Sequence, residues 1–165
     1  MAQREQQTRN LPATQALRVL KQSNVPFKAH LYRYEEHGGT EVAARELGIE
    51  EHAVVKTLVM EDDQRRPLVV LMHGDRRVST RSLARLLGAR WVTPCEPQVA
   101  QRHTGYLVGG TSPIGMKKPL PVYVESTILE LPRIYINGGK RGLLLEMDPK
   151  DLIGLLSARP VQVAT

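Results

Sequence analysis

The chain has 165 residues, of which 41% are hydrophobic and 24% charged, a composition typical of one globular domain with a substantial core. Its single cysteine, Cys95, excludes an internal disulfide and a multi-cysteine metal site. The apolar runs are far shorter than the roughly 20 residues that span a bilayer. We therefore expect a cytoplasmic protein with no membrane association, no metal and no cofactor.

The formal net charge of +6 is unevenly distributed. Residues 35–63 hold nine acids against two bases, whereas residues 64–102 hold eight arginines against two acids. An arginine-rich segment attracts polyanions through bidentate phosphate contacts and counterion release, so nucleic acid is a candidate partner. Arginines on a solvated helix face would give the same pattern.

The hydrophobic pattern predicts a flexible arm over residues 1–13 and a single domain over 14–165. In the first half of the chain we expect a helix capped by Thr14, a strand over 27–34, a helix capped by Thr40 and closed by Gly48, and strands over 53–60 and 67–73. A helix capped by Ser79 or Thr80, a strand at 91–93 and a short helix at 97–102 should follow. The last part should hold strands over 121–125, 134–137 and 143–147 and a final helix capped by Asp148. The irregular strand spacing favours an α/β domain of the α+β type. Its sheet would be mixed, barrel-like and of about seven strands, with short helices around it.

A lysine stands in the middle of the apolar stretch over residues 53–60. Because side chains alternate across a strand, Lys56 shares a face with Val54 and Leu58, and Thr57 points to the opposite face. An unpaired ammonium is costly to bury, so Lys56 needs an acidic partner, a route to solvent or an anionic ligand in a pocket. A lysine that snorkels from a strand end is the alternative explanation.

Two glycine-rich segments follow further along the chain. Residues 103–118 contain four glycines with Thr111 and Ser112, which is typical of a constrained loop with accessible backbone amides. This loop lacks the Gly-Lys-Ser/Thr ending of a P-loop. Residues 137–142 form a second glycine-rich turn with two cations, for which a hairpin is the simpler explanation.

Several kinds of catalytic centre are absent from the sequence. The five histidines show no HExxH motif, and no nucleophile elbow occurs. Cys95 lies between two prolines without a nearby base, which favours an incidental thiol over a nucleophile. The remaining groups could hold a carbonyl and a phosphate without supplying a strong nucleophile.

Three segments together resemble the YbaK/EbsC proteins, relatives of the prolyl-tRNA synthetase editing domain. They are Lys56-Thr57-Leu58, residues 104–115 (TGYLVGGTSPIG) and residues 138–143 (GGKRGL). The resemblance implies trans-editing, in which a wrongly attached amino acid is removed from tRNA, with cysteine on the proline tRNA as the favoured substrate and alanine as the rival. The partners it implies are aminoacyl-tRNA and, as a candidate, prolyl-tRNA synthetase.

The resemblance also suggests which residues form the site. Lys56 matches the key lysine that holds the aminoacyl-adenosine end, and we take it as the catalytic residue. The substrate-binding candidates are Tyr32, Thr57, Gly109, Gly110, Ser112, Asn137 and Gly138. The candidate tRNA contacts are Arg81, Arg85, Lys117 and Lys140. In the family's cysteine-specific branch the thiol of the substrate itself is thought to attack the ester carbonyl, which suits a chain without a catalytic dyad.

Three positions depart from the family pattern: Asn137 replaces a usual serine, Leu144 a polar or acidic residue, and Gly39 a common phenylalanine. All three could border the amino-acid pocket, so the identity of the removed amino acid stays open. Two other functions also fit the sequence. One is a non-catalytic tRNA- or synthetase-binding module, and the other is a small-molecule hydrolase unrelated to tRNA.

Overall fold

The computed structural model describes residues 11–165, so most of the predicted arm over 1–13 lies outside the described residues. The strands form one mixed sheet in the order β1-β7-β6-β2-β3-β5-β8, and β4 pairs with β2 beside it. Their bounds are β1 Lys28–Leu31, β2 Val54–Asp62, β3 Pro67–His73, β4 Val92–Pro94, β5 Val122–Glu125, β6 Ile134–Asn137, β7 Leu143–Met147 and β8 Arg159–Val161. The predicted single α/β domain with a mixed sheet is confirmed, with eight strands where about seven were expected.

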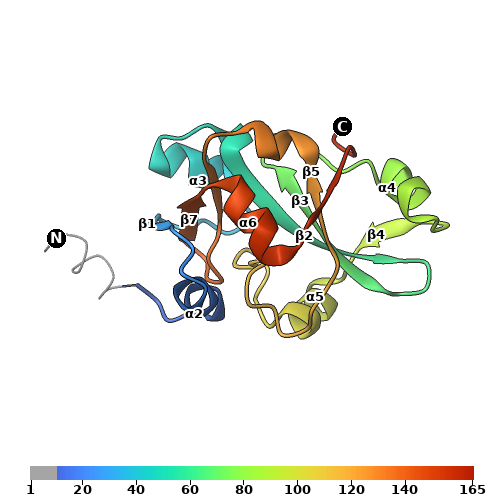
Figure 1. Ribbon diagram of the computed structural model, residues 1–165, viewed down its shortest axis with the longest axis horizontal. Coiled ribbons are helices and arrows are strands. Elements are labelled where there is room, and N and C mark those ends of the chain that lie inside the picture. Colours follow the sequence, from blue (N-terminus) through green and yellow to red (C-terminus); the bar gives the residue numbers. More distant parts are fainter. Residues whose placement is uncertain (1–10) are drawn as a thin grey trace, which may run out of the picture.

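Five α-helices of residues 11–165 lie around the sheet (Figure 1). They are α2 Gln15–Gln22, α3 Gly39–Leu47, α4 Thr80–Leu87, α5 Pro97–Thr104 and α6 Pro149–Leu156, with 3-10 turns η1 at Glu51–Ala53 and η2 at Ser126–Glu130. The main hydrophobic core joins one face of the sheet to α2, α5 and α6. Two smaller clusters lie on the other face, one beneath α4 and one beneath α3. None of the helices in residues 11–165 is long and apolar enough to cross a membrane.

Most local signals in the sequence led to the right element. The Thr14, Ser79 and Asp148 side chains each accept a backbone N–H at the start of α2, α4 and α6. Gly48 and Gly88 end α3 and α4 in the left-handed conformation that glycine adopts without strain.

Three sequence predictions differ from the structure. Helix α3 begins at Gly39 with Gly38 as its N-cap, whereas the Thr40 hydroxyl donates to Glu51 Oε1 (2.9 Å) and to the Gly74 carbonyl (3.3 Å). Thr40 therefore ties α3 to η1 and β3 rather than capping the helix. The strand expected over 27–34 ends at Leu31, and the edge strand β8 was not predicted.

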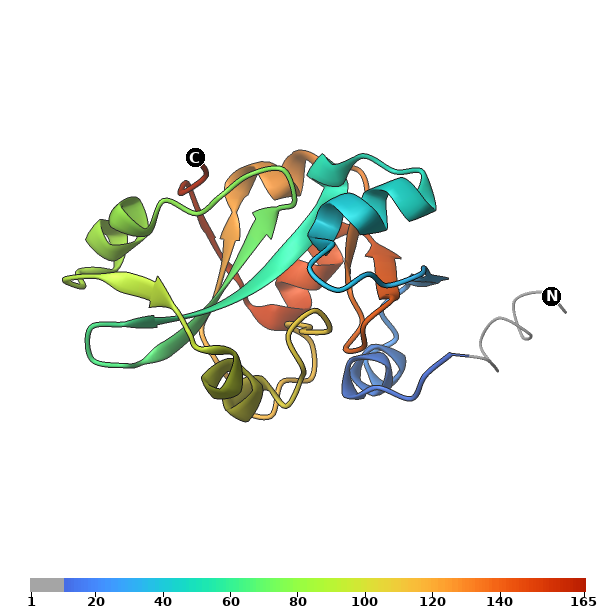
Figure 2. The same cartoon turned by 180° about the vertical axis from the view of Figure 1, so that it is seen from behind.

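Strand β2 is the longest strand and has an interruption along one edge (Figure 2). On one side it pairs with β3 from Val55 to Glu61. On the other side it pairs with β6 at Val54 and Val55, and with β4 only from Met60 onward. The edge between Val55 and Met60 is thus left without a neighbouring strand, and the candidate site lies there.

Candidate active site

A pocket of about 530 Å³ opens at this interruption. Its floor is β2, and its walls come from the segment after β1, from α3, from the start of α5, and from the two glycine-rich loops. The polar, aromatic and loop residues of the lining, together with Leu144, include Tyr32, Tyr34, Gly39, Lys56, Thr57, Cys95, Gly109, Asn137 and Arg141. The three positions that depart from the family pattern, Gly39, Asn137 and Leu144, all line this pocket.

Lys56 is partly buried and lines the pocket wall. Its face is the predicted one: Val54 belongs to the cluster beneath α3 and Leu58 packs on the cluster beneath α4, so the lysine stem lies between two apolar groups. Its ammonium donates a hydrogen bond to the Arg76 carbonyl. Burial lowers the pKa of Lys56, and the positive charge of Arg77 acts in the same direction, against Glu51 and Asp75.

No carboxylate of the described residues forms an ion pair with Lys56. One carbonyl oxygen satisfies only one of the three donors of an ammonium group. Two donors of the Lys56 ammonium therefore remain without a hydrogen-bond partner in the described part of the chain, and its role in binding stays a prediction.

Thr57 supplies both main-chain and side-chain groups. The Val54 carbonyl accepts from Gly74 on the β3 side, and the Val59 carbonyl accepts from Cys95 on the opposite side. Because backbone groups alternate along a strand, the N–H and C=O of Thr57 point to the same side as those of Val59, toward the interruption. The Thr57 Oγ1 atom is buried and has no hydrogen-bond partner among the described residues.

We expect Thr57→Val to be more stable than wild type. A buried hydroxyl without a partner costs about 1–3 kcal/mol, and valine keeps the shape of threonine. The measurement is thermal unfolding. Thr104→Val is the matched control, because the Thr104 hydroxyl donates to the Ala100 carbonyl (2.8 Å) and accepts from the Tyr106 N–H (3.1 Å), so its removal should destabilise the fold. Equal destabilisation by both variants would contradict this prediction.

The two glycine-rich loops are fastened to each other. The Asn137 side chain donates through Nδ2 to the Gly109 carbonyl (3.1 Å), and Arg141 Nε donates to the Val108 carbonyl (3.0 Å). The Arg141 guanidinium also lies over the Tyr34 ring, 5.2 Å from its centroid. The loop at 105–115 and the turn at 137–142 therefore form one wall of the pocket, to which Gly109 contributes.

The predicted substrate-binding residues divide into two groups. Tyr32, Thr57, Gly109 and Asn137 line the pocket together with Lys56. Gly110, Ser112 and Gly138 lie behind the lining, where Ser112 is fully buried and its Oγ accepts the Ile114 N–H (3.2 Å). The four cations predicted to contact tRNA, Arg81, Arg85, Lys117 and Lys140, are exposed and outside the lining.

Three further residues line the pocket that the sequence did not point to: Tyr34, Cys95 and Arg141. In the sequence, Tyr34 could be recognised only as an aromatic residue on a predicted strand, and Arg141 only as a cation in a glycine-rich turn.

Cys95 lines the pocket, but its thiol is a weak nucleophile. Burial and, to a smaller extent, the neighbouring Glu61 carboxylate, 3.9 Å from the sulfur, together raise the pKa of the Cys95 thiol to about 11. Since only the thiolate is nucleophilic, this thiol does not serve as a nucleophile near neutral pH.

We expect Cys95 to react slowly with iodoacetamide at pH 8, since its thiolate fraction is roughly 200-fold below that of a free cysteine. The alkylation rate should rise with pH up to about pH 11. In Glu61→Gln the rise should begin at lower pH, because the repelling carboxylate is gone. An alkylation rate that levels off near pH 8.5 in the wild type would contradict the assignment.

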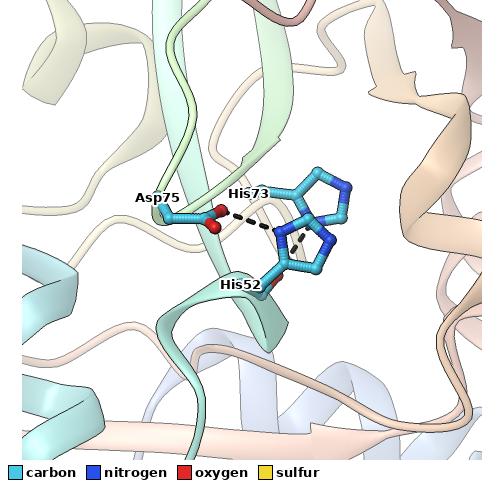
Figure 3. Close-up of side chains that lie close together, drawn as sticks. All are labelled: His52, His73 and Asp75. Atoms are coloured by element: carbon cyan, nitrogen blue, oxygen red, sulfur yellow. Dashed lines mark hydrogen bonds and ion pairs between the residues drawn. The ribbon is translucent and has the colours of Figure 1, made fainter.

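His52 of η1, His73 at the end of β3 and Asp75 shortly after it lie together, with candidate ligand atoms within 4.8 Å of one another (Figure 3). Their geometry does not suit a metal ion. The two imidazole rings are stacked at 3.8 Å and 8°, so their in-plane lone pairs do not converge. His73 Nδ1 donates to the His52 carbonyl (2.7 Å), and His73 Nε2 accepts from the Thr127 hydroxyl (2.7 Å).

The three residues instead fix the turn that holds Lys56. His52 Nδ1 is hydrogen-bonded to Asp75 Oδ1 at 2.8 Å. Burial would raise the pKa of Asp75, but the hydrogen bond and charge of His52 outweigh it and lower that pKa. Burial lowers the pKa of His73, which is consistent with a neutral ring. The next residue after Asp75 is Arg76, whose carbonyl receives the Lys56 ammonium.

Comparison with known proteins agrees with this arrangement. The family model of the aminoacyl-tRNA editing domain matches residues 35–155, which include β2 and both glycine-rich loops. The chain belongs to the aminoacyl-tRNA editing domain family. Within it, EbsC of Enterococcus faecalis, provisionally named a Cys-tRNA(Pro)/Cys-tRNA(Cys) deacylase, is 32% identical over 153 residues, covering 92% of this chain and 93% of EbsC. The predicted membership of the YbaK/EbsC group is thereby confirmed.

Two further relatives place this editing domain in context. The proline–tRNA ligase of Levilactobacillus brevis is 27% identical over 130 residues, which cover 77% of this chain and 22% of the ligase. The editing domain thus corresponds to one segment of that larger protein. A crystal structure provisionally named a trans-editing enzyme for prolyl-tRNA synthetase has the same fold, with a TM-score of 0.81 at 24% identity over 94% of this chain and 99% of that one.

Proposed function

We propose that this protein is a trans-editing deacylase that removes cysteine from Cys-tRNA(Pro) in the cytoplasm. The observation that carries the proposal is the Lys56 ammonium, partly buried at the wall of a pocket and without a carboxylate partner in the described part of the chain. Similarity to EbsC supports cysteine as the amino acid, and similarity to a segment of proline–tRNA ligase supports the proline tRNA and its synthetase as partners.

In this reaction the thiol of the bound cysteine attacks its own ester carbonyl. A carbon–sulfur bond forms, the carbon–oxygen bond to the ribose breaks, and the thiol proton goes to the departing ribose oxygen. The products are free tRNA and a cysteine thiolactone, which water opens afterwards. The protein has two tasks: to hold the thiol against the carbonyl, and to stabilise the charge that develops on oxygen.

The residues of the pocket fit these tasks. The Lys56 ammonium would lie against the leaving ribose oxygen or the adjacent phosphate. The Thr57 N–H, which points into the interruption of the sheet, would donate to the ester carbonyl oxygen, and the Thr57 C=O would accept from the substrate amino group. Such fixed donors need no reorganisation during the reaction, which makes them more effective than water.

The walls of the pocket bear on which amino acid is removed. Val55, Val59 and Ala100 give an apolar lining, and the uncharged Cys95 thiol lies among them. This surface suits a small amino-acid side chain and does not repel any such side chain by charge. Alanine fits it as well as cysteine, so alanine removal is the second candidate, and it would require water in place of the substrate thiol.

A panel of charged tRNAs tests the proposal. Purified protein is incubated with tRNA(Pro) carrying cysteine, alanine, proline or S-methylcysteine, and with Cys-tRNA(Cys). Turnover should be fastest for Cys-tRNA(Pro) and should be lost with S-methylcysteine, which has no free thiol. Equal turnover of S-methylcysteine would refute the thiol mechanism and favour attack by water. If no ester turns over faster than in buffer, the protein is a binding module and the proposed activity fails.

A further inference from the structure

The arginines noted in the sequence gather on one part of the fold. Residues 62–93, called the arginine lobe below, comprise the end of β2, strand β3, helix α4 and the start of β4, packed around the cluster beneath α4. The lobe contains seven arginines, three aspartates, and neither lysine nor glutamate. All seven arginines are exposed: Arg65, Arg66, Arg76, Arg77, Arg81, Arg85 and Arg90.

The three aspartates are already occupied within the fold. Asp62 pairs with the Arg66 side chain (2.8 Å), Asp63 accepts the backbone N–H of Arg90 (3.2 Å), and Asp75 bonds to His52 (2.8 Å). Among residues 11–165, six of the seven arginines therefore have no carboxylate partner. A surface with this many uncompensated cations favours a polyanionic partner.

The lobe borders the pocket at two points. The Arg76 carbonyl holds the Lys56 ammonium, and β4 runs directly into Pro94 and Cys95 of the pocket wall. An RNA whose acylated end enters the pocket can therefore continue over the lobe without leaving the surface. Helix α2 lies on the opposite side of the molecule from α4 in both views (Figures 1 and 2).

An aromatic side chain lies between the arginines and the pocket. Trp91 is 47% exposed, although it is the largest side chain of the lobe, and it follows Arg90 directly. Two residues separate it from Pro94, so the two positions lie roughly 10 Å apart along an extended strand. Exposed aromatic rings next to arginines are the usual means of stacking unpaired nucleobases. Neither the core nor the pocket chemistry accounts for an exposed tryptophan here.

We propose that the arginine lobe binds the acceptor arm of the tRNA, with arginines on the phosphates and Trp91 stacked on an unpaired nucleobase that precedes the terminal adenosine. This rests on the proposed function, because it takes the acylated 3′ end to lie in the pocket. It assigns a separate task to the lobe: affinity for the RNA body, independent of the chemistry at Lys56.

The sole tryptophan of the chain allows a direct test in the wild-type protein. Uncharged tRNA(Pro) with its intact 3′ end should quench the fluorescence of Trp91 on titration, whereas the same tRNA trimmed of its unpaired 3′ nucleotides should bind with much less quenching. Trp91→Ala should weaken binding of the intact tRNA roughly tenfold and leave binding of the trimmed tRNA unchanged. Binding of intact tRNA without a change in Trp91 emission would overturn the stacking contact.

The phosphate contacts are tested by a pair of double variants that remove equal charge. Arg81→Gln/Arg85→Gln lies on α4 in the lobe, and Arg18→Gln/Lys21→Gln lies on the exposed face of α2. The lobe variant should bind tRNA roughly tenfold more weakly, with a salt slope lower by about two, while the α2 variant should bind like wild type. Equal binding by the two variants, or equal wild-type affinity for polyglutamate of the same charge, would overturn the proposal.

Deacylation assays on the same variants separate the two proposals. If the wild type binds tRNA through the lobe but hydrolyses no aminoacyl ester, the lobe proposal stands and the proposed activity fails. If the wild type deacylates Cys-tRNA(Pro) and the lobe variant has the same kcat/KM at subsaturating tRNA, the activity stands and the lobe proposal fails.

Discussion

Lys56→Ala is expected to lower the rate of Cys-tRNA(Pro) deacylation by about 10²- to 10³-fold, the loss found when one preorganised charge-stabilising donor is removed. The ammonium has one carbonyl partner and no ion pair among the described residues, so its remaining donors are available to the substrate. The measurement is single-turnover deacylation with excess enzyme, which reports the chemical step rather than tRNA release.

The same substitution should leave the fold intact. Burial lowers the pKa of Lys56, so the charged form is less favourable in the folded state than in the unfolded state. Removing this charge therefore relieves a penalty at neutral pH, where the unfolded chain carries a protonated lysine. We expect Lys56→Met, which keeps the apolar stem, to unfold at the wild-type temperature or above while being as inactive as the alanine variant. Retention of activity by either variant would remove Lys56 from the mechanism.

Gly110→Ala is expected to reduce both activity and stability. A Cβ atom on Gly110 would lie 2.8 Å from the backbone nitrogen of Arg141 and 3.0 Å from the carbonyl carbon of Lys140. Backbone atoms cannot rotate away as a side chain can, so the two glycine-rich loops must separate. Overpacking of this kind costs about 1–3 kcal/mol. A shift of about 1 Å in Gly109, which lines the pocket, could lower the rate roughly 100-fold.

Gly154→Ala is the matched control for this experiment. A Cβ atom on Gly154 in α6 would meet nothing within 4 Å, and the backbone there is helical. Alanine at that position should raise stability by about 0.5–1 kcal/mol without affecting deacylation. The comparison uses thermal unfolding and kcat/KM for both variants. Wild-type activity in Gly110→Ala would show that contact between the loops is not needed.

Local rules were sufficient for much of the fold and for the floor of the pocket. Strand alternation correctly placed Lys56 on one face with Val54 and Leu58, and Thr57 on the opposite face with Val55 and Val59. In the structure the first face meets the two smaller clusters and the second meets the main core. Cap residues correctly marked most helix starts. Thr40 was the exception, because its hydroxyl found tertiary partners in Glu51 and Gly74. Strand β8 escaped prediction because it has three residues, one of them a proline, and is held by pairing with β5.

The walls of the pocket could not be predicted from local sequence rules, because they are formed by residues that lie far apart in the chain. Tyr34, Cys95 and Arg141 come from three distant parts of the chain and meet only because β2 pairs in parallel with β6 and antiparallel with β3 and β4. Asn137 shows the same limit. Its amide both donates to Gly109 and accepts from the N–H groups of Gly139 and Lys140, so a departure from the family serine becomes a bridge between the two loops.

The missing neighbour of β2 between Val55 and Met60 has a consequence for how such a domain could change over evolutionary time. In the proposed function, the bare strand edge binds the atoms that every aminoacyl ester has in common, whichever side chain it carries. Selectivity can then be altered at wall positions such as Gly39, Asn137 and Leu144 while the edge that grips the shared part of the ester stays as it is. One scaffold could in this way give rise to proofreading proteins for different misacylation errors.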